Sequence, residues 1–278
     1  MLIGIGPNKD PLCYGSCFIA WPHMAITAKH VIEELLRHDP GIIEGESCNY
    51  EYWIIQVKWN GNEHDYVIWT IDSIATSPHS DIAIIWLRSL NDIAARHKEW
   101  KVVPVTFDPP PIGATVRAFG LHNFRFEGSR VNSDGKFEHI EMKCDRSTSA
   151  GTVKQHYWEG RDRGMYNFPC IEVDARFDHG MSGGLVIDEH SEVCGIVCGS
   201  LPASSAEDNH VSYISMLWPM MGIPVDRRLV PDAVETTRYR LQDLSARGIF
   251  TPTGWDRVLI QNAIDEGGSI TISYARKQ

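Results

Sequence analysis

Ser182 stands among three glycines in residues 178–184, which spell DHGMSGG, and strand-like apolar runs flank this stretch. Glycine is used where the backbone takes unusual dihedral angles or comes close to a ligand. A serine between such glycines can present its hydroxyl and a backbone N–H to one point in space. Acyl transfer needs these groups, a nucleophile and oxyanion donors, and Ser182 and Gly180 are the candidates for them. The alternative interpretation is a glycine-rich turn in which the serine makes a local hydrogen bond.

A nucleophilic serine needs a general base and an acid that orients the base, and the chain offers a candidate for each. His30 ends the run TAKH, where we expect Thr27 to cap a helix over residues 28–37 and His30 to lie in its first turn. Asp81 opens the apolar strand DIAII. Each residue alone has an ordinary explanation. A histidine near a helix start is more often a cap or a packed side chain, and an aspartate before a strand is more often a turn residue.

Short strands must position these residues, and a charged, proline-rich stretch at residues 91–113 divides them into two groups. The first group comprises residues 14–21, 24–27, 50–59, 66–75 and 81–87, and the second comprises residues 114–120, 136–144, 151–158, 169–174, 185–187, 193–200 and 211–216. We predict an all-β fold of two antiparallel six-stranded β-barrels, because barrel closure removes exposed sheet edges. The predicted barrels span residues 1–98 and 99–222.

The tail, residues 223–278, has a different pattern. Residues 232–247 follow a proline, begin with a capping-box-like stretch and precede a glycine, so they predict a helix. A second helix is expected over residues 253–264, with a last strand at residues 269–274. We expect a C-terminal helical extension that packs against the second barrel and offers a place for partner docking.

Composition excludes several classes of protein. The formal net charge is -10 and no stripe of basic residues appears, which argues against nucleic-acid binding. No apolar run approaches the roughly 18 residues of a membrane span, and the first residues lack the basic and apolar regions of a signal peptide. The seven cysteines, an odd number mostly in apolar runs, suit a reducing cytoplasm.

The pairs Cys13/Cys17 and Cys194/Cys198, each four residues apart, raise the alternative of a zinc site. Residues so spaced on a strand lie more than about 10 Å apart, which argues against a shared metal. We therefore expect no metal and no cofactor.

Taken together in chain order, the TAKH, DIAII and GMSGG boxes resemble the chymotrypsin/trypsin-like serine protease superfamily, over roughly residues 10–222. Their separations, about 50 and about 100 residues, also suit that family. The resemblance implies that Ser182 attacks the scissile carbonyl, His30 is the general base and Asp81 orients the imidazole. It further implies that the N–H groups of Gly180 and Ser182 form an oxyanion hole.

The resemblance also suggests which residues bind the polypeptide substrate. These are Cys198, Gly199 and Ser200 on a strand that pairs with the peptide, Arg176 at the pocket floor and His210 beside the pocket. A guanidinium at the floor would favour an acidic P1 residue, the residue that donates the scissile carbonyl. In the alternative, Arg176 points to solvent or pairs with Asp174 or Asp178. The negative net charge also argues mildly against an acidic substrate.

Two residues depart from the family pattern. Val31 stands where many secreted members have a disulfide cysteine, and Met181 stands where zymogen-activated members have an aspartate that pairs with a new N-terminus. We expect no activation by removal of a propeptide. The expected enzyme is thus either competent as made or gated by a partner.

Two other functions stay open beside an intracellular serine endopeptidase. The first is a catalytically silent module that binds peptides without cutting them, against which all three triad residue types argue. The second is an effector component of a larger assembly, which acts on one partner protein.

Overall fold

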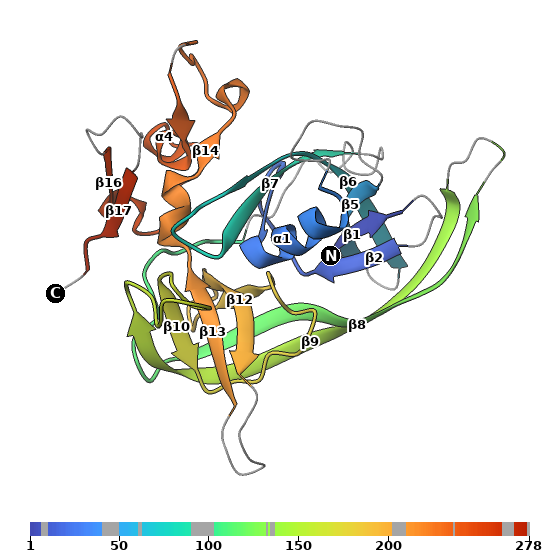
Figure 1. Cartoon of the computed structure of the whole chain (residues 1–278), viewed down its shortest axis with the longest axis horizontal. Helices are drawn as coiled ribbons and strands as arrows, with labels where there is room; N and C mark the ends of the chain where they lie inside the picture. Colours follow the sequence, from blue (N-terminus) through green and yellow to red (C-terminus); the bar gives the residue numbers. More distant parts are fainter. Residues whose placement is uncertain are drawn as a thin grey trace.

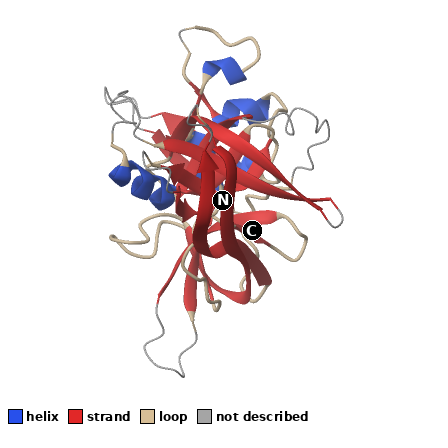
Figure 2. Ribbon diagram, turned by 90° about the vertical axis from the view of Figure 1, so that its right-hand side faces the viewer, coloured by secondary structure: helices blue, strands red, loops and turns tan. Residues whose placement is uncertain are grey.

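The computed structural model is built mainly of strands, with short helices around them (Figures 1 and 2). It describes residues 1–6, 11–40, 50–60, 63–89, 103–131, 133, 137–201, 210–235, 237–262 and 270–276. The predicted domain boundary between residues 98 and 99 lies outside these residues. The predicted boundary at residue 222 coincides with the end of the 3₁₀ helix η1, Trp218–Gly222, which follows the second barrel.

The N-terminal half forms a seven-stranded antiparallel sheet in the order β2-β1-β5-β6-β7-β4-β3. Its strands are β1 Leu2–Ile5, β2 Pro11–Gly15, β3 Phe18–Trp21, β4 Met24–Ala28, β5 Glu51–Asn60, β6 Glu63–Thr76 and β7 Ile82–Ser89. Every residue of β4 is buried, in keeping with its place between β3 and β7. The helix α1, Lys29–His38, follows β4 directly and packs on the sheet through Val31, Ile32 and Leu35.

This half has seven strands where we predicted six. The additional strand β1 pairs with both β2 and β5, and all four of its residues are buried. The strand predicted over residues 14–21 is divided between β2 and β3. The division lies at Ser16, whose N–H donates to Ser182 O (2.8 Å), a residue of the other half of the molecule.

The C-terminal half is a closed six-stranded barrel, as predicted, in the order β10-β13-β12-β11-β8-β9. Its strands are β8 Thr115–Val131, β9 Phe137–Tyr157, β10 Cys170–Val173, β11 Leu185–Ile187, β12 Val193–Leu201 and β13 Val211–Met216. One apolar core connects both halves and includes Ile26 and Ile84 of the first sheet and Val186 and Ile196 of the barrel. The two halves therefore pack as one body.

The hairpin of β8 and β9 is longer than predicted and continues past β1 and β2 (Figure 1). The two strands predicted over residues 136–144 and 151–158 are replaced by the single strand β9, which runs from Phe137 to Tyr157. The polar residues between them resemble a loop in sequence but pair with β8, for example Ser147 with Gly120. Phe124 and Met142 of this hairpin pack on a cluster of buried residues in β1 and β5.

The extension contains less helix than predicted. Its only α-helix in the described residues is α4, Leu241–Ala246, which ends before Gly248 as expected but begins nine residues later than predicted. Residues before it form β15, Tyr239–Arg240, which pairs with β14, Pro224–Val225. The Leu241 N–H donates to Ile223 O (3.0 Å), so this pairing holds the start of the helix.

The second predicted helix, residues 253–264, is also wrong. The 3₁₀ helix η3, Trp255–Arg257, leads into the strand β16, Val258–Asn262. This strand pairs with β17, Ile270–Tyr274, which confirms the predicted last strand. A strand partner supplied from later in the chain thus overrides the local helix signal. The remaining short 3₁₀ helix of the described residues, η2, spans Arg227–Leu229.

Candidate active site

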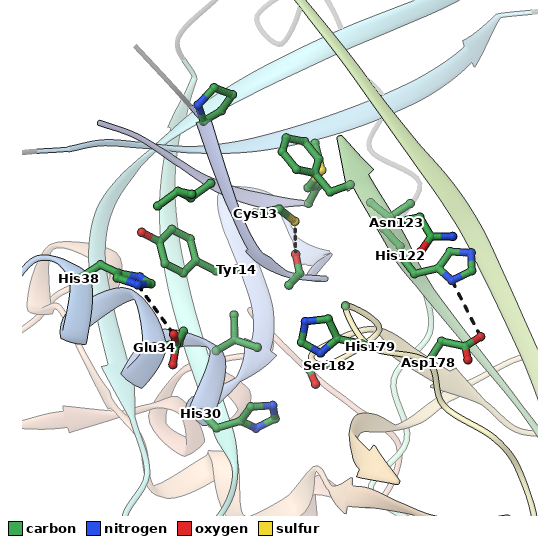
Figure 3. A pocket seen from close by; sticks show the side chains of 18 of the residues that line it. Cys13, Tyr14, His30, Glu34, His38, His122, Asn123, Asp178, His179 and Ser182 are labelled. Atoms are coloured by element: carbon green, nitrogen blue, oxygen red, sulfur yellow. Dashed lines mark hydrogen bonds and ion pairs between the residues drawn. The ribbon is translucent and has the colours of Figure 1, made fainter. Parts of the chain in front are cut away.

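His30 is the second residue of α1 and borders the pocket shown in Figure 3. Asp81 holds it in place. Because Ala28 of β4 pairs with Ile82 of β7, Asp81 lies beside the start of the helix. Its Oδ1 accepts the His30 backbone N–H (2.9 Å) and its Oδ2 lies 2.7 Å from His30 Nδ1. One carboxylate therefore caps the helix and orients the imidazole ring.

The predicted helix cap was wrong. The N-cap residue is Ala28, which offers no side-chain hydrogen bond. Thr27 is fully buried, and its hydroxyl donates to Ser16 O (2.7 Å) instead. A capping Thr27 would accept the backbone N–H of His30. Asp81 accepts that N–H instead, and it lies beside a neighbouring strand rather than in the local sequence.

The His30–Asp81 pair has the geometry of a base held in one tautomer. The Asp81 side chain is only 9% exposed, while that of His30 is 40% exposed and borders a pocket. With Nδ1 donating to the carboxylate, Nε2 is the nitrogen left to accept a proton. Burial lowers the pKa of His30, but the hydrogen bond and charge of Asp81, with Glu33, raise the pKa above its ordinary value.

The raised pKa predicts the pH dependence of catalysis. If His30 must be neutral to act as a base, kcat/KM should rise with pH through an inflection above 6.5, the ordinary value for histidine. The Glu33→Gln variant should move this inflection to lower pH, because Glu33 favours the protonated ring. Steady-state hydrolysis of a peptide ester between pH 5 and 9, on the order of two units either side of neutrality, measures both. An inflection at or below 6.5 would contradict the assignment.

The loop that carries Ser182 is pressed against the first sheet. Gly183 has φ +79°, and a Cβ there would lie 2.2 Å from Thr27 Oγ1 and 2.3 Å from Ser16 O. A Cβ on Gly184 would lie 2.1 Å from Phe119 O. These glycines are therefore required by close backbone approach, which is the reason for the SGG sequence.

Among the described residues, three backbone N–H groups of this loop have no acceptor, namely those of His179, Gly180 and Ser182. The amides of two neighbouring residues do donate hydrogen bonds. Met181 N–H donates to Asp178 O (3.1 Å), and Gly183 N–H donates to Val197 O (2.8 Å). Gly180 itself has φ +93°, a conformation suited to glycine. The two predicted oxyanion donors are thus among the amides of this loop that are free to bind a ligand.

Ser182 and His30 line one pocket of about 930 Å³, which also contains residues of β2, β8 and α1 (Figure 3). The Ser182 hydroxyl donates to Cys198 O (3.3 Å), and no hydrogen bond joins it to His30 in the described part of the chain. The structure therefore brings the three predicted catalytic residues to one place.

The predicted substrate-binding residues are only partly brought together. Cys198, Gly199 and Ser200 lie on β12 beside the Ser182 loop. His210 is exposed just before β13. Arg176 lines the same pocket as His30 and Ser182, but its side chain is 66% exposed and its Nε donates to Asp178 Oδ1 (2.8 Å). The pairing with Asp178 is the alternative stated above, and the acidic P1 preference stays a prediction.

The sequence did not single out Ser16, which joins the two halves at the site. Its hydroxyl donates to Gly180 O (2.9 Å) and accepts the Leu121 N–H (2.8 Å). Its own N–H donates to Ser182 O. The one sequence feature that could have pointed to Ser16 is the glycine before it, at a break between two strands.

His122 and His179 also line the pocket and were not predicted (Figure 3). His122 Nδ1 lies 3.9 Å from Asp178 Oδ2. His179 lies within the DHGMSGG stretch, next to Gly180, whereas His122 lies on β8 and no local motif marks it.

In the described part of the chain, no group of three or more histidine, cysteine or acidic side chains is arranged to hold a metal ion. No helix there is long and apolar enough to cross a membrane.

Comparison with known proteins supplies the family. The model of the trypsin-like peptidase domain matches residues 15–196, which is more than half of the chain. No curated protein matches the sequence.

Among solved structures, the chain resembles the active form of the Rv3671c protease from M. tuberculosis, with 16% identity and a TM-score of 0.44 over 77% of this chain and 74% of that one. It also resembles Deg5, with 17% identity and a TM-score of 0.44 over 76% of this chain and 82% of that one. At these identities and scores the likeness assigns no function. The match to the domain model, however, spans all three of the boxes described above, and by it the chain belongs to the trypsin-like peptidase family.

Proposed function

We propose that this protein is a serine endopeptidase that cleaves polypeptides through an acyl-enzyme on Ser182. The observation that carries the proposal is the His30–Asp81 pair, joined at 2.7 Å, in the pocket that Ser182 also lines. The free amides of Gly180 and Ser182 support it, because they offer donors to a developing oxyanion. Membership of a peptidase family makes a polypeptide the expected substrate.

In the proposed reaction, the Ser182 hydroxyl turns from Cys198 O toward His30 Nε2. A bond forms between Oγ and the carbonyl carbon while the hydroxyl proton passes to Nε2. The carbonyl oxygen becomes an oxyanion that accepts hydrogen bonds from Gly180 and Ser182 N–H, each worth roughly 3 kcal/mol. The C–N bond then breaks as Nε2 gives its proton to the leaving amine. Water repeats these steps on the ester and restores Ser182.

One observation favours a second candidate, a peptide-binding module that is catalytically silent or gated by a partner. The Ser182 hydroxyl donates its hydrogen bond to Cys198 O rather than to His30. A protein fixed in this arrangement would bind peptides and leave them intact.

Labelling with a fluorophosphonate probe distinguishes the two candidates, since the probe reacts only with an activated serine. We expect the wild-type protein to be labelled and the Ser182→Ala variant to remain unlabelled, as judged by intact mass and peptide mapping. A folded wild-type protein that stays unlabelled, or is labelled at another serine, would favour the non-cleaving module.

A further inference from the structure

One residue of the first sheet holds both candidate oxyanion donors, Gly180 and Ser182. That residue is Ser16, which lies between β2 and β3 and is only 3% exposed. Its hydroxyl donates to Gly180 O (2.9 Å), and its backbone N–H donates to Ser182 O (2.8 Å). Ser16 therefore binds the carbonyl groups of two residues whose own N–H groups have no acceptor in the described part of the chain.

The hydrogen bond from the Ser16 hydroxyl fixes the peptide group between Gly180 and Met181. This group is planar, so its carbonyl and its N–H point in opposite directions. Ser16 binds the carbonyl on one side, and Asp178 O accepts the Met181 N–H (3.1 Å) on the other. The Met181 side chain is fully buried in the core. A rotation of this peptide group would break both hydrogen bonds.

The Ser16 side chain is itself fixed by its neighbours. Its Oγ accepts the Leu121 N–H of β8 (2.8 Å), so the hydroxyl acts as donor and acceptor at once. The Ser16 carbonyl accepts the hydroxyl of Thr27 (2.7 Å), which is fully buried on β4. If the Ser16 hydroxyl turned away, the Leu121 N–H and the Gly180 carbonyl would each lose a partner. Ser16 is thus arranged before any substrate binds.

The glycines of the serine loop make such an attachment necessary. Gly180 has φ +93° and Gly183 has φ +79°, and glycine populates more backbone conformations than any other residue. Without the Ser16 hydroxyl, the Gly180 carbonyl loses this donor and the adjoining peptide group can rotate. A loop with several conformations would present the Gly180 N–H to an oxyanion only part of the time.

We infer that Ser16 is a positioning residue for the oxyanion hole, because its hydroxyl and its N–H hold the serine loop in the conformation that stabilises the transition state. This inference rests on the proposed function, in which an oxyanion forms at Ser182. In the described structure, Ser16 does not line the pocket that His30 and Ser182 share. It acts through the backbone of the loop and not on the substrate.

The first test compares the steady-state kinetics of the wild type and Ser16→Ala on one peptide ester. We expect kcat to fall about 100-fold, the lower range for loss of one oxyanion donor, and KM to change by no more than about threefold. Ser16→Thr keeps the hydroxyl and should recover most of the lost rate. The matched control is Ser245→Ala, which removes another buried serine hydroxyl that donates to a backbone carbonyl, that of Phe250 in the extension. This control should leave kcat unchanged.

The second test uses a peptide boronic acid, which binds Ser182 as a tetrahedral adduct with a boron-bound oxygen at the oxyanion position. Ser16→Ala should weaken this binding by about the same 100-fold factor as kcat. Binding of an uncleaved peptide is measured in the Ser182→Ala background, with and without Ser16→Ala, and should be the same in both. A general loss of structure would weaken both kinds of binding.

The outcomes separate this inference from the proposed function. Fluorophosphonate labelling of the wild type tests the proposed function, and thermal unfolding verifies the fold of each variant. A labelled wild type whose Ser16→Ala variant keeps nearly full kcat overturns the inference and leaves the proposed function standing. Equal losses of boronate and peptide binding also overturn it, because they indicate a general structural role.

A further variant covers the case in which Ser16→Ala does not fold. Ser16→Cys keeps a side chain of similar shape, but its thiol is a weak hydrogen-bond donor, so we expect kcat to fall in this variant too. Full kcat in folded Ser16→Cys would overturn the inference. A wild type that neither labels nor cleaves overturns both the inference and the proposed function.

Discussion

Replacing Ser182 by alanine is expected to lower kcat about a millionfold, to a rate near that left by substrate binding and the oxyanion donors alone. The reason is that the acyl-enzyme cannot form without Oγ. The folded state loses only the hydrogen bond to Cys198 O, a change of about 1 kcal/mol in the free energy of unfolding. Burst and steady-state kinetics on a peptide ester measure the rate, and thermal unfolding checks the fold.

The His30→Ala variant should lower kcat by about the same factor as Ser182→Ala. The double variant should lower kcat little further, because the two residues act as one unit. Ser129→Ala, an exposed serine on the hairpin of β8 and β9, provides the matched control and should retain full activity. Turnover preserved in Ser182→Ala, or additive losses in the double variant, would refute the assignment of these residues.

Replacing Asp81 by asparagine is expected to lower kcat roughly ten-thousandfold. In the wild type, both carboxylate oxygens accept hydrogen bonds, one from the His30 backbone N–H and one from Nδ1. Asparagine has only one oxygen, and if that oxygen keeps the backbone N–H, the amide group donates to Nδ1. The proton then moves to Nε2, where it removes the lone pair that the serine needs.

The matched control is Asp226→Asn. Asp226 also accepts a backbone N–H, from Arg228 (2.8 Å), but it lies in the extension and should leave kcat unchanged. A pH titration of the His30 ring by NMR gives an independent readout, since loss of the Asp81 charge should lower the pKa of His30. An Asp81→Asn variant with nearly full activity and an unshifted His30 titration would show that Asp81 does not orient the base.

The predicted triad residues depend on short local sequences, and this explains why they could be identified before the fold. TAKH places a histidine at the junction of a strand and a helix, DIAII places an acid at the head of a buried strand, and SGG permits close backbone contact. At Gly183 the structure supplies the reason for the sequence, since a Cβ would collide with Thr27 and Ser16. The closed second barrel was also predictable, because its strands are separated by clear turns.

Other predictions failed where the deciding partner is distant in the chain. Thr27 has the local pattern of a helix cap, yet Asp81 takes that role because β4 and β7 are adjacent. Tyr239 and Arg240, directly before Leu241, lie in the predicted helix but pair with β14. The polar centre of β9 resembles a loop because neither face is fully buried, and its pairing with β8 decides its conformation.

The sequence by itself determined the family boxes, the candidate nucleophile, base and acid, and the mainly β architecture. Only the tertiary structure decided the direction of each side chain at the site. It turned Arg176 outward to Asp178, directed the Ser182 hydroxyl to Cys198 O and carried Ser200 across to Phe177. The physical reason is that a residue's position along a strand follows from local pattern, whereas its hydrogen-bond partner is set by which segments the fold brings within about 3 Å.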